Sequence, residues 1–206
     1  MLFLDEMLEF SRRVLEVTPP AARGRNASPI ARAARTVGLS ARFMLVGAMN
    51  PCPCGFLGDT VRVCRCTPVT DLQLSRPPVG TAARSADLTV EVPALPLEAL
   101  GTVESGESSA AVRARVAVAR SRQNARYEAD RIRTNAELTA RLMPKHAQPN
   151  AAGLRVLSKA VSRLGLSARG YDRIRKVART IADLADTTNI GADEVAEALQ
   201  FRMIVR

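Results

Sequence analysis

The chain has 206 residues, of which 47% are apolar, and these values suit one compact domain or two small ones with an ordinary core. It contains no run of about 18 or more apolar residues, and Asp5, Glu6 and Glu9 lie where a signal peptide carries positive charge, so we expect a cytoplasmic protein without a membrane anchor. The net charge of +10 is uneven, because residues 1–103 hold 11 basic and 9 acidic side chains (+2) and residues 104–206 hold 19 and 11 (+8).

Arginine supplies most of this positive charge, since only three of the 30 cationic side chains are lysines. A guanidinium group matches phosphate geometry, so the basic second half predicts a polyanionic partner such as nucleic acid. The alternative interpretation is that arginine-rich helices simply keep their outer faces solvated.

Two apolar runs in the first half predict short buried strands. Residues 1–4 are continuously apolar and end at Asp5 and Glu6, and residues 43–49 form a second run that ends at Asn50. Each predicted strand is therefore followed directly by polar side chains.

The rest of the first half predicts fewer regular elements. Residues 10–16 have the pattern of a helix, whereas the proline-rich stretch 17–29 predicts a loop. Residues 67–86 show no periodicity and predict little order, and the alternation over 88–92 predicts a strand. Strands together with a helix predict an α/β first half.

The second half predicts an all-helical bundle, because apolar residues recur there at helical spacing. Serines suited to N-caps precede two of the expected helices, and Gly165 is suited to end another. The expected helices run from Ser108–Ser109 to about Tyr127, over 135–142, through Leu154 to Leu164, from Ser167 to Leu184, and from Ala192 to Phe201.

The first apolar run and its acids resemble a Walker B strand. An acid at the carboxyl end of a strand reaches the ligand crevice of an α/β sheet, where Asp5 could hold Mg²⁺ and Glu6 could polarise the attacking water. Strand ends and helix caps also produce such acid pairs by chance, so this signal alone is weak.

Four cysteines form the sharpest chemical signal. Cys52 and Cys54 are separated from Cys64 and Cys66 by nine residues, and two such pairs can direct four thiolates toward one tetrahedral metal. Zinc is the predicted metal, although the commonest zinc motif has two residues between paired cysteines rather than one. Free cytosolic thiols and an empty site are the alternatives, and iron–sulfur motifs are spaced differently.

The single histidine, His146, follows Pro144 and Lys145 in an expected loop, so we expect it to be exposed. One histidine makes Ser-His or Cys-His nucleophilic catalysis an unpromising interpretation. The 206 residues contain no Gly-x-x-x-x-Gly-Lys-Ser/Thr stretch, which is the loop that ordinarily cradles the phosphates of ATP.

Several long segments resemble the Mg-chelatase-like AAA+ ATPases of the competence ComM type. The matching stretches are MLFLDEMLEFSRRVL (1–15), ARFMLVGAMNPCPCG (41–55), GLSARGYDR (165–173), VARTIADLA (177–185) and EVAEALQFR (194–202). The resemblance implies the fold as a partial AAA+ P-loop-type α/β core over residues 1–103, followed by an all-helical C-terminal lid over 104–206.

The resemblance also implies an activity and a set of site residues. Members of this family are expected to be hexameric ATPases that move branched DNA in natural transformation, with ATP and Mg²⁺ as ligands and a ring of identical subunits. By motif position, Asp5 and Glu6 match Walker B, Asn50 matches the polar sensor after the next strand, and Arg169 matches the lid arginine that senses the γ-phosphate. Some relatives carry the four cysteines as a zinc loop.

This chain departs from the family pattern in ways that bear on activity. The family begins upstream with a domain resembling a Lon protease fold and a phosphate loop, so we expect this chain to correspond to a C-terminal portion that does not hydrolyse ATP alone. Residues 17–29 and 72–86 differ from the pattern, and Ser85 replaces an arginine that reaches a neighbouring subunit's nucleotide. Arg84 is adjacent, but a slip of one residue redirects a side chain.

Two other functions remain as alternatives. The chain could be a non-catalytic zinc- and DNA-binding or partner-binding module, either an adaptor or a degraded paralogue. It could also be a Mg-chelatase subunit of pigment synthesis, which the cysteine loop and residues 167–185 disfavour.

Overall fold

The computed structural model describes residues 1–11, 14–15, 28–32, 35–39, 43–50, 52, 54–57, 62–66, 86–93 and 106–203. The chain divides into two compact units, Met1–Ala86 and Asp87–Arg206. The predicted disorder over 67–86, except for Ala86, and most of the predicted loop over 17–29 lie outside the described residues.

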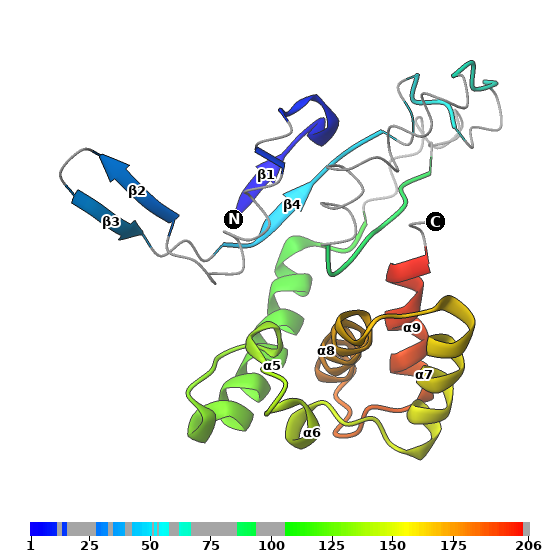
Figure 1. Ribbon diagram of the computed structural model, residues 1–206. Helices are drawn as coiled ribbons and strands as arrows, with labels where there is room; N and C mark the ends of the chain where they lie inside the picture. The colour runs from blue at the N-terminus through cyan, green and yellow to red at the C-terminus, as the bar shows by residue number, and fades with distance from the viewer. Residues whose placement is uncertain are drawn as a thin grey trace. The chain divides into compact units, whose positions relative to one another are not determined.

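The first unit contains a parallel pair of strands, β1 (Leu2–Leu4) and β4 (Leu45–Gly47), drawn in Figure 1. Leu2 pairs with Leu45 and Leu4 pairs with Gly47, so the carboxyl ends of both strands lie at the same edge. Both strands fall within the apolar runs that predicted them. This register determines where the residues after each strand are placed.

A separate antiparallel hairpin joins β2 (Ser28–Arg32) to β3 (Arg35–Leu39). The loop prediction over 17–29 was therefore wrong at its last two residues, because Ser28 pairs with Leu39 and Pro29 pairs with Gly38. Both strands of a two-stranded sheet are edge strands, where a proline without an N–H group is tolerated.

The described core of the first unit is small and lies beside the parallel strands. Leu4, Met7 and Leu15 are buried there, with Leu45 packed against them. Met7 begins the 3₁₀ turn η1 (Met7–Glu9), and a Cβ added to Gly47 would lie 2.8 Å from the Met7 sulfur. The absence of a side chain on β4 at this point thus lets η1 pack closely against the strand.

Of the helix predicted over 10–16, the structure describes Phe10 and Ser11, which are not helical, and Val14 and Leu15, which are, so the prediction was wrong at its first two residues. The amide groups of Val14 and Leu15 both donate to the carbonyl of Ser11, at 3.0 and 3.2 Å. The strand predicted over 88–92 was wrong: residues 86–93 are described and contain no strand. Thr89 instead donates its amide to the carbonyl of Phe201 at 3.0 Å, and no described strand pairs with this alternating segment.

The second unit is helical, as the periodicity predicted. Its long helices are α5 (Ser109–Tyr127), α7 (Ala151–Leu164), α8 (Ala168–Leu184) and α9 (Ala192–Met203), and its short elements are η2 (Glu128–Asp130), η3 (Asn135–Glu137) and α6 (Met143–His146). None of the helices that the structure describes combines the length and the apolar character that a bilayer crossing requires.

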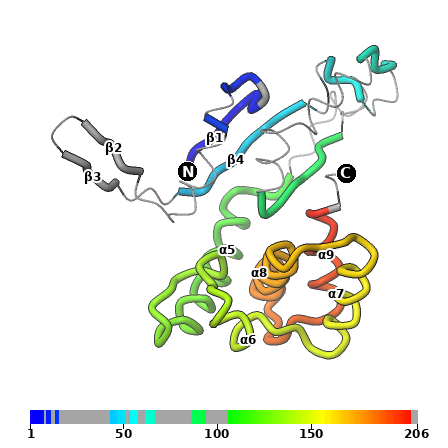
Figure 2. The backbone as a smooth tube through the Cα atoms, in the orientation of Figure 1, coloured from blue at the N-terminus to red at the C-terminus, as the bar shows by residue number. Residues whose placement is uncertain are grey.

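Helix α8 lies between α5 and α9, and α7 packs against α9, as Figures 1 and 2 show. Buried side chains from all four helices form the core, including Tyr127, Leu157, Ile174 and Val195, which are at most 1% exposed. The start of α7 is tied to the start of α9, because Asn150 donates its amide to the carbonyl of Ile190 at 2.9 Å.

Local signals set the helix ends, as the sequence indicated. The side chains of Ser108, Asn150 and Ser167 accept hydrogen bonds from the amides of Ala111, Gly153 and Gly170, which are N-cap contacts. Gly165 ends α7 with φ of +60°, a left-handed conformation that glycine adopts without steric cost.

The helix predicted over 135–142 was wrong, because only the 3₁₀ turn η3 and the four-residue α6 form in this region. Asn135 is buried and bonds to residues far away in sequence, and Pro144 lies in the first turn of α6. These tertiary contacts and the proline replace the expected continuous helix.

Candidate functional site

The predicted acids Asp5 and Glu6 lie at the carboxyl edge of the parallel strand pair. The two chain segments are joined there, because Ala48 donates its amide to Leu4 and Met7 donates its amide to Ala48, each at 2.8 Å. Both acids are exposed, and the Asp5 carboxylate accepts the amide of Glu6 at 3.1 Å.

Glu6 has a left-handed backbone conformation, with φ of 46°. Residues other than glycine rarely adopt this conformation, and it turns the chain sharply out of β1 into η1. Asn50 follows β4 at the same edge and is also exposed. The strand pair therefore places Asp5, Glu6 and Asn50 at one edge of the first unit.

The four cysteines converge, as their spacing predicted. All four sulfur atoms lie within 4.8 Å of one another. The Sγ atoms of Cys52 and Cys54 are 3.3 Å apart, those of Cys52 and Cys64 3.7 Å, and those of Cys54 and Cys64 3.5 Å. These sulfurs are therefore free thiols, because a disulfide bond requires about 2.05 Å.

Local turns bring the two cysteine pairs together. Gly55 has φ of +79°, and its amide donates to the carbonyl of Cys52 at 2.9 Å, which closes the first turn. Arg62 lies over the ring of Phe56, with the guanidinium carbon 5.1 Å from the ring centre. Cys52 is buried, and the other three sulfur-bearing residues are partly exposed.

Crowding of the sulfurs separates their pKa values. Amide groups of Phe56 and Arg65 bond to the Cys54 sulfur and lower its pKa to about 6. For Cys64, a backbone hydrogen bond from Cys66 favours the thiolate, but partial burial and the sulfurs of Cys54 and Cys52 outweigh it and raise its pKa to about 12. The neighbouring Cys54 likewise raises the pKa of Cys66.

The cluster fits a zinc ion. Four sulfurs at about 2.3 Å from a tetrahedral zinc lie about 3.8 Å from one another, close to the separations found here. A divalent cation would also remove the repulsion that keeps the thiols of Cys64 and Cys66 protonated. These four residues are thus the candidate metal ligands, and zinc supplies structural cross-linking rather than chemistry when all four positions are protein thiolates.

Arg169, the remaining predicted site residue, belongs to the second unit. It lies in the first turn of α8, two residues after the N-cap Ser167, and it is exposed. The grouping of Arg169 with Asp5, Glu6 and Asn50 around one ligand stays a prediction.

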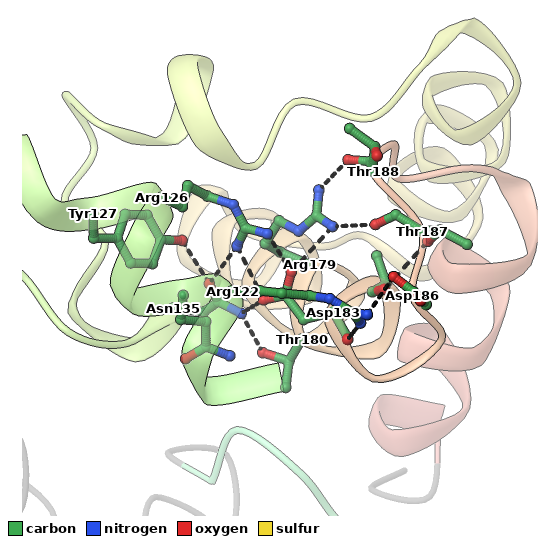
Figure 3. A network of polar contacts seen from close by, with 12 residues as sticks. Arg122, Arg126, Tyr127, Asn135, Arg179, Thr180, Asp183, Asp186, Thr187 and Thr188 are labelled. Atoms are coloured by element: carbon green, nitrogen blue, oxygen red, sulfur yellow. Dashed lines mark hydrogen bonds and ion pairs between the residues drawn. The ribbon is translucent and has the colours of Figure 1, made fainter. Parts of the chain in front are cut away.

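Sequence reasoning missed a buried polar network that joins α5, η3 and α8, shown in Figure 3. At its centre is the carboxylate of Asp183, whose side chain is fully buried. Arg126 of α5 donates to both of its oxygens, one at 3.0 Å, and Asn135 donates to it at 2.9 Å. Arg179 lies 3.2 Å away, one helical turn earlier on α8.

The same network fixes the end of α8. Arg179 donates to the carbonyls of Thr188 and Thr187 at 2.7 and 2.8 Å, and Arg122 donates to the carbonyl of Asp183 at 2.6 Å. Burial alone would raise the pKa of Asp183, but hydrogen bonds from Arg126 and Asn135 outweigh it, so this pKa lies below its usual range. The sequence signal was the spacing of Arg179 and Asp183, four residues apart on one helix face.

The expectation that His146 is exposed was wrong. Its side chain is 7% exposed, and Nε2 lies 2.7 Å from the carboxylate of Asp130, which Lys145 also contacts at 2.9 Å. The imidazole ring packs edge-on against Tyr127, with ring centres 5.0 Å apart. The hydrogen bond from Lys145, followed by that from His146, lowers the pKa of Asp130. His146, the last residue of α6 rather than part of the expected loop, thus turns inward because its ring contacts the carboxylate of Asp130 in η2.

Comparison with known families gives two adjoining matches. Residues 1–100 match the family model described as magnesium chelatase, subunit ChlI, and residues 106–202 match the one described as magnesium chelatase, subunit ChlI C-terminal. The chain belongs to the magnesium chelatase ChlI-like family. The predicted family membership is confirmed.

The ChlI-like chain also resembles several curated bacterial proteins. It is 39% identical to competence protein ComM of Haemophilus influenzae over 100% of this chain and 39% of that protein. It is 38% identical to an uncharacterized protein of Mycobacterium tuberculosis over 98% of this chain and 39% of that protein. It is 36% identical to protein YifB of Escherichia coli over 100% of this chain and 40% of that protein. The chain therefore spans about two fifths of the length of these relatives.

Proposed function

We propose that residues 1–206 are the part of an ATP-driven DNA motor that follows its phosphate loop. The observation that carries the proposal is the placement of Asp5, Glu6 and Asn50 at one edge of a parallel strand pair. Ligands of α/β sheets bind outside the carboxyl ends of the strands, where these three side chains stand. Homology to ComM supports the same proposal, together with an AAA+ type of nucleotide core.

In this proposal each side chain has one role toward a bound nucleotide. Asp5 holds Mg²⁺, Glu6 orients and deprotonates the attacking water, and Asn50 positions that water through its amide. Arg169 stabilises the charge that develops on the transferred phosphoryl group. When bound, ATP supplies the phosphoryl group itself, and Mg²⁺ neutralises its charge.

The phosphates need a cradle that these residues do not encode. The 206 residues contain no Gly-x-x-x-x-Gly-Lys-Ser/Thr stretch, so the backbone amides and the lysine that ordinarily hold them must come from outside the chain. Ser85 at the position of the family's intersubunit arginine also argues against efficient activation of a neighbour's nucleotide. We therefore propose that the chain by itself binds Mg-ATP weakly and does not hydrolyse it.

Two measurements test this proposal. Phosphate release from Mg-ATP should not exceed that of Glu6→Gln, and robust release that depends on Glu6 would overturn the second half of the proposal. A fluorescent ATP analogue should bind in a Mg²⁺-dependent manner, and Asp5→Ala should weaken this binding. Glu9→Ala, which removes an equally exposed acid nearby, is the matched control. Equal effects of the two substitutions would overturn the assignment of Asp5.

DNA and further copies of the chain are the proposed partners. The second half carries a charge of +8, and binding to phosphates by arginine and lysine weakens steeply as salt rises. A ring of identical subunits is the assembly that the family resemblance implies.

The four-cysteine cluster favours a second candidate function. A zinc-linked loop is a structural element, and with a basic helical unit it would suit a non-catalytic module that attaches to DNA or to a full-length partner ring. The two proposals differ over nucleotide: an adaptor predicts DNA binding with no Mg²⁺-dependent binding of the ATP analogue.

A further inference from the structure

Three cationic side chains share one exposed face of α7. Arg155, Lys159 and Arg163 follow one another at intervals of four residues, and all three are exposed. Positions four apart lie on the same side of a helix, so the three side chains form a stripe. We call Arg155, Lys159 and Arg163 the α7 stripe.

The opposite face of α7 holds the helix in place. Gly153, Leu157 and Ala160 are buried, and α7 packs there against α9 (Figure 1). The stripe is thus presented by a helix with a fixed orientation in its unit. Ser158 and Ser162 are also exposed beside the stripe and add hydroxyl groups to this face.

Nothing on α7 neutralises the stripe, because the helix contains no acidic residue. Several other cations of the helical unit are paired with nearby acids, among them the pairs Arg115–Glu107, Arg122–Asp186, Arg126–Asp183, Lys145–Asp130, Arg173–Asp87 and Arg175–Asp172. Among the residues that the structure describes, no acid forms such a pair with the α7 stripe. Its three charges therefore remain available to a ligand.

The spacing of the stripe suits a linear polyanion. Intervals of four residues correspond to about 6 Å along the helix, so the three cations extend over about 12 Å. A DNA duplex carries one phosphate charge per about 1.7 Å of its axis, so several phosphates lie within reach of flexible side chains over that length. A single small anion would use only one of the three positions.

We propose that the α7 stripe binds the phosphate backbone of duplex DNA. The inference rests on the proposed DNA-binding function and assigns it to a surface. Binding through phosphates carries no sequence information, so the surface holds DNA in position without reading its bases.

The test compares two triple variants of the full chain that lose the same charge. One is Arg155→Gln, Lys159→Gln and Arg163→Gln, and the control is Arg113→Gln, Arg133→Gln and Arg141→Gln, at three exposed positions outside α7. Binding of a labelled duplex is followed by fluorescence anisotropy over a series of NaCl concentrations. Circular dichroism checks that both variants retain their helices.

Loss of three phosphate contacts should reduce the slope of log affinity against log salt by about 2.7, which corresponds to about 0.9 per contact. The control should change the slope by less, and Arg155→Lys with Arg163→Lys should keep the wild-type slope. Equal reductions of the slope in the two triple variants would overturn the assignment to the α7 stripe, whereas the proposed DNA-binding function of the chain would stand. A wild-type chain that binds no DNA at low salt would overturn both the inference and the DNA function. A variant that loses only binding to anionic vesicles would overturn the assignment to DNA.

Discussion

At the residue scale, Asp183 is the most consequential side chain of the helical unit. It is a fully buried carboxylate that receives hydrogen bonds from Arg126 and Asn135 and an ion pair from Arg179. Burial is the main reason that the pKa of Arg179 is lowered, whereas the hydrogen bond to Asp183 raises the pKa of Arg126. Removing the carboxylate charge would leave the buried guanidinium of Arg179 and the partly buried guanidinium of Arg126 without their anionic partner.

We expect Asp183→Asn to lower the free energy of unfolding by about 3–5 kcal/mol, the cost of breaking a buried ion pair from one side. The measurement is urea denaturation followed by circular dichroism. Asp193→Asn, the same chemical change at an exposed position of α9, should alter the free energy of unfolding by about 0.5 kcal/mol or less. Comparable losses in both variants would contradict the role given to the network.

The pH dependence of this difference has a definite sign. The pKa of Asp183 is lowered in the folded protein, so its contribution is fully present above the ordinary value of about 3.9. The contribution of Asp183 to the free energy of unfolding is lost as the pH falls from that value through the lower pKa that Asp183 has in the folded protein. The gap in unfolding free energy between wild type and Asp183→Asn should therefore narrow only below about pH 4.

At the element scale, the sequence predicted what local chemistry determines. Ser108 and Ser167 cap α5 and α8, and Gly165 ends α7, because each of these signals acts within a few residues. The predictions over 88–92 and 135–142 were wrong because they depended on distant residues. An alternating segment needs a neighbouring strand, and Asn135 bonds instead to Thr180 and Asp183.

The candidate sites likewise divide into those that nearby residues predict and those that depend on residues distant in sequence. The cysteine cluster was predictable because short turns such as that at Gly55 bring close neighbours together. The common edge of Asp5 and Asn50 followed from two apolar runs becoming parallel strands. The spacing of Arg179 and Asp183 predicts one ion pair of the Asp183 network, but nothing near Asp183 or His146 in sequence identifies Arg126 or Asp130 as a partner, so the rest of the network and the burial of the His146 side chain were not predictable.

Two glycines in equivalent positions provide a prediction about the α7–α9 contact. Gly153 and Gly170 each lie third in their helix and donate an amide to the N-cap side chain. A Cβ on Gly153 would lie 2.7 Å from the carbonyl oxygen of Gly191, which is backbone, whereas a Cβ on Gly170 would meet its nearest neighbour at 3.6 Å.

Gly153→Ala should therefore lower the thermal unfolding temperature, because α7 must shift away from the segment that leads into α9. Overpacking of this kind costs about 1–3 kcal/mol. Gly170→Ala should be neutral or should raise the temperature, because alanine favours helix by up to about 1 kcal/mol over glycine. A destabilisation of the same size in both variants would show that the close approach to Gly191 is not the cause.

At the scale of the whole molecule, the two units differ in the interactions that stabilise each of them. Apolar side chains of the helical unit form a continuous core, from Tyr127 to Leu199. Among the described residues of the first unit, the core comprises only Leu4, Met7 and Leu15, with Leu45 against them. A small apolar core is ordinarily supplemented by cross-links or metal ligation, and the four-cysteine cluster lies in this unit.

We therefore expect one zinc ion per chain in protein purified without added metal, measured by plasma emission spectrometry. The cluster includes all four cysteines of the chain, so the double variant Cys54→Ser with Cys64→Ser should abolish zinc binding. A zinc chelator should expose the first unit to limited proteolysis, while the thermal transition of the helices, followed by circular dichroism, stays in place. Added Zn²⁺ should restore the protection and added Mg²⁺ should not, since thiolates select the softer ion. If the protein contains no zinc and the chelator does not change its proteolysis pattern, these sulfurs are ordinary free thiols. If the chelator also unfolds the helices, the two units do not unfold separately.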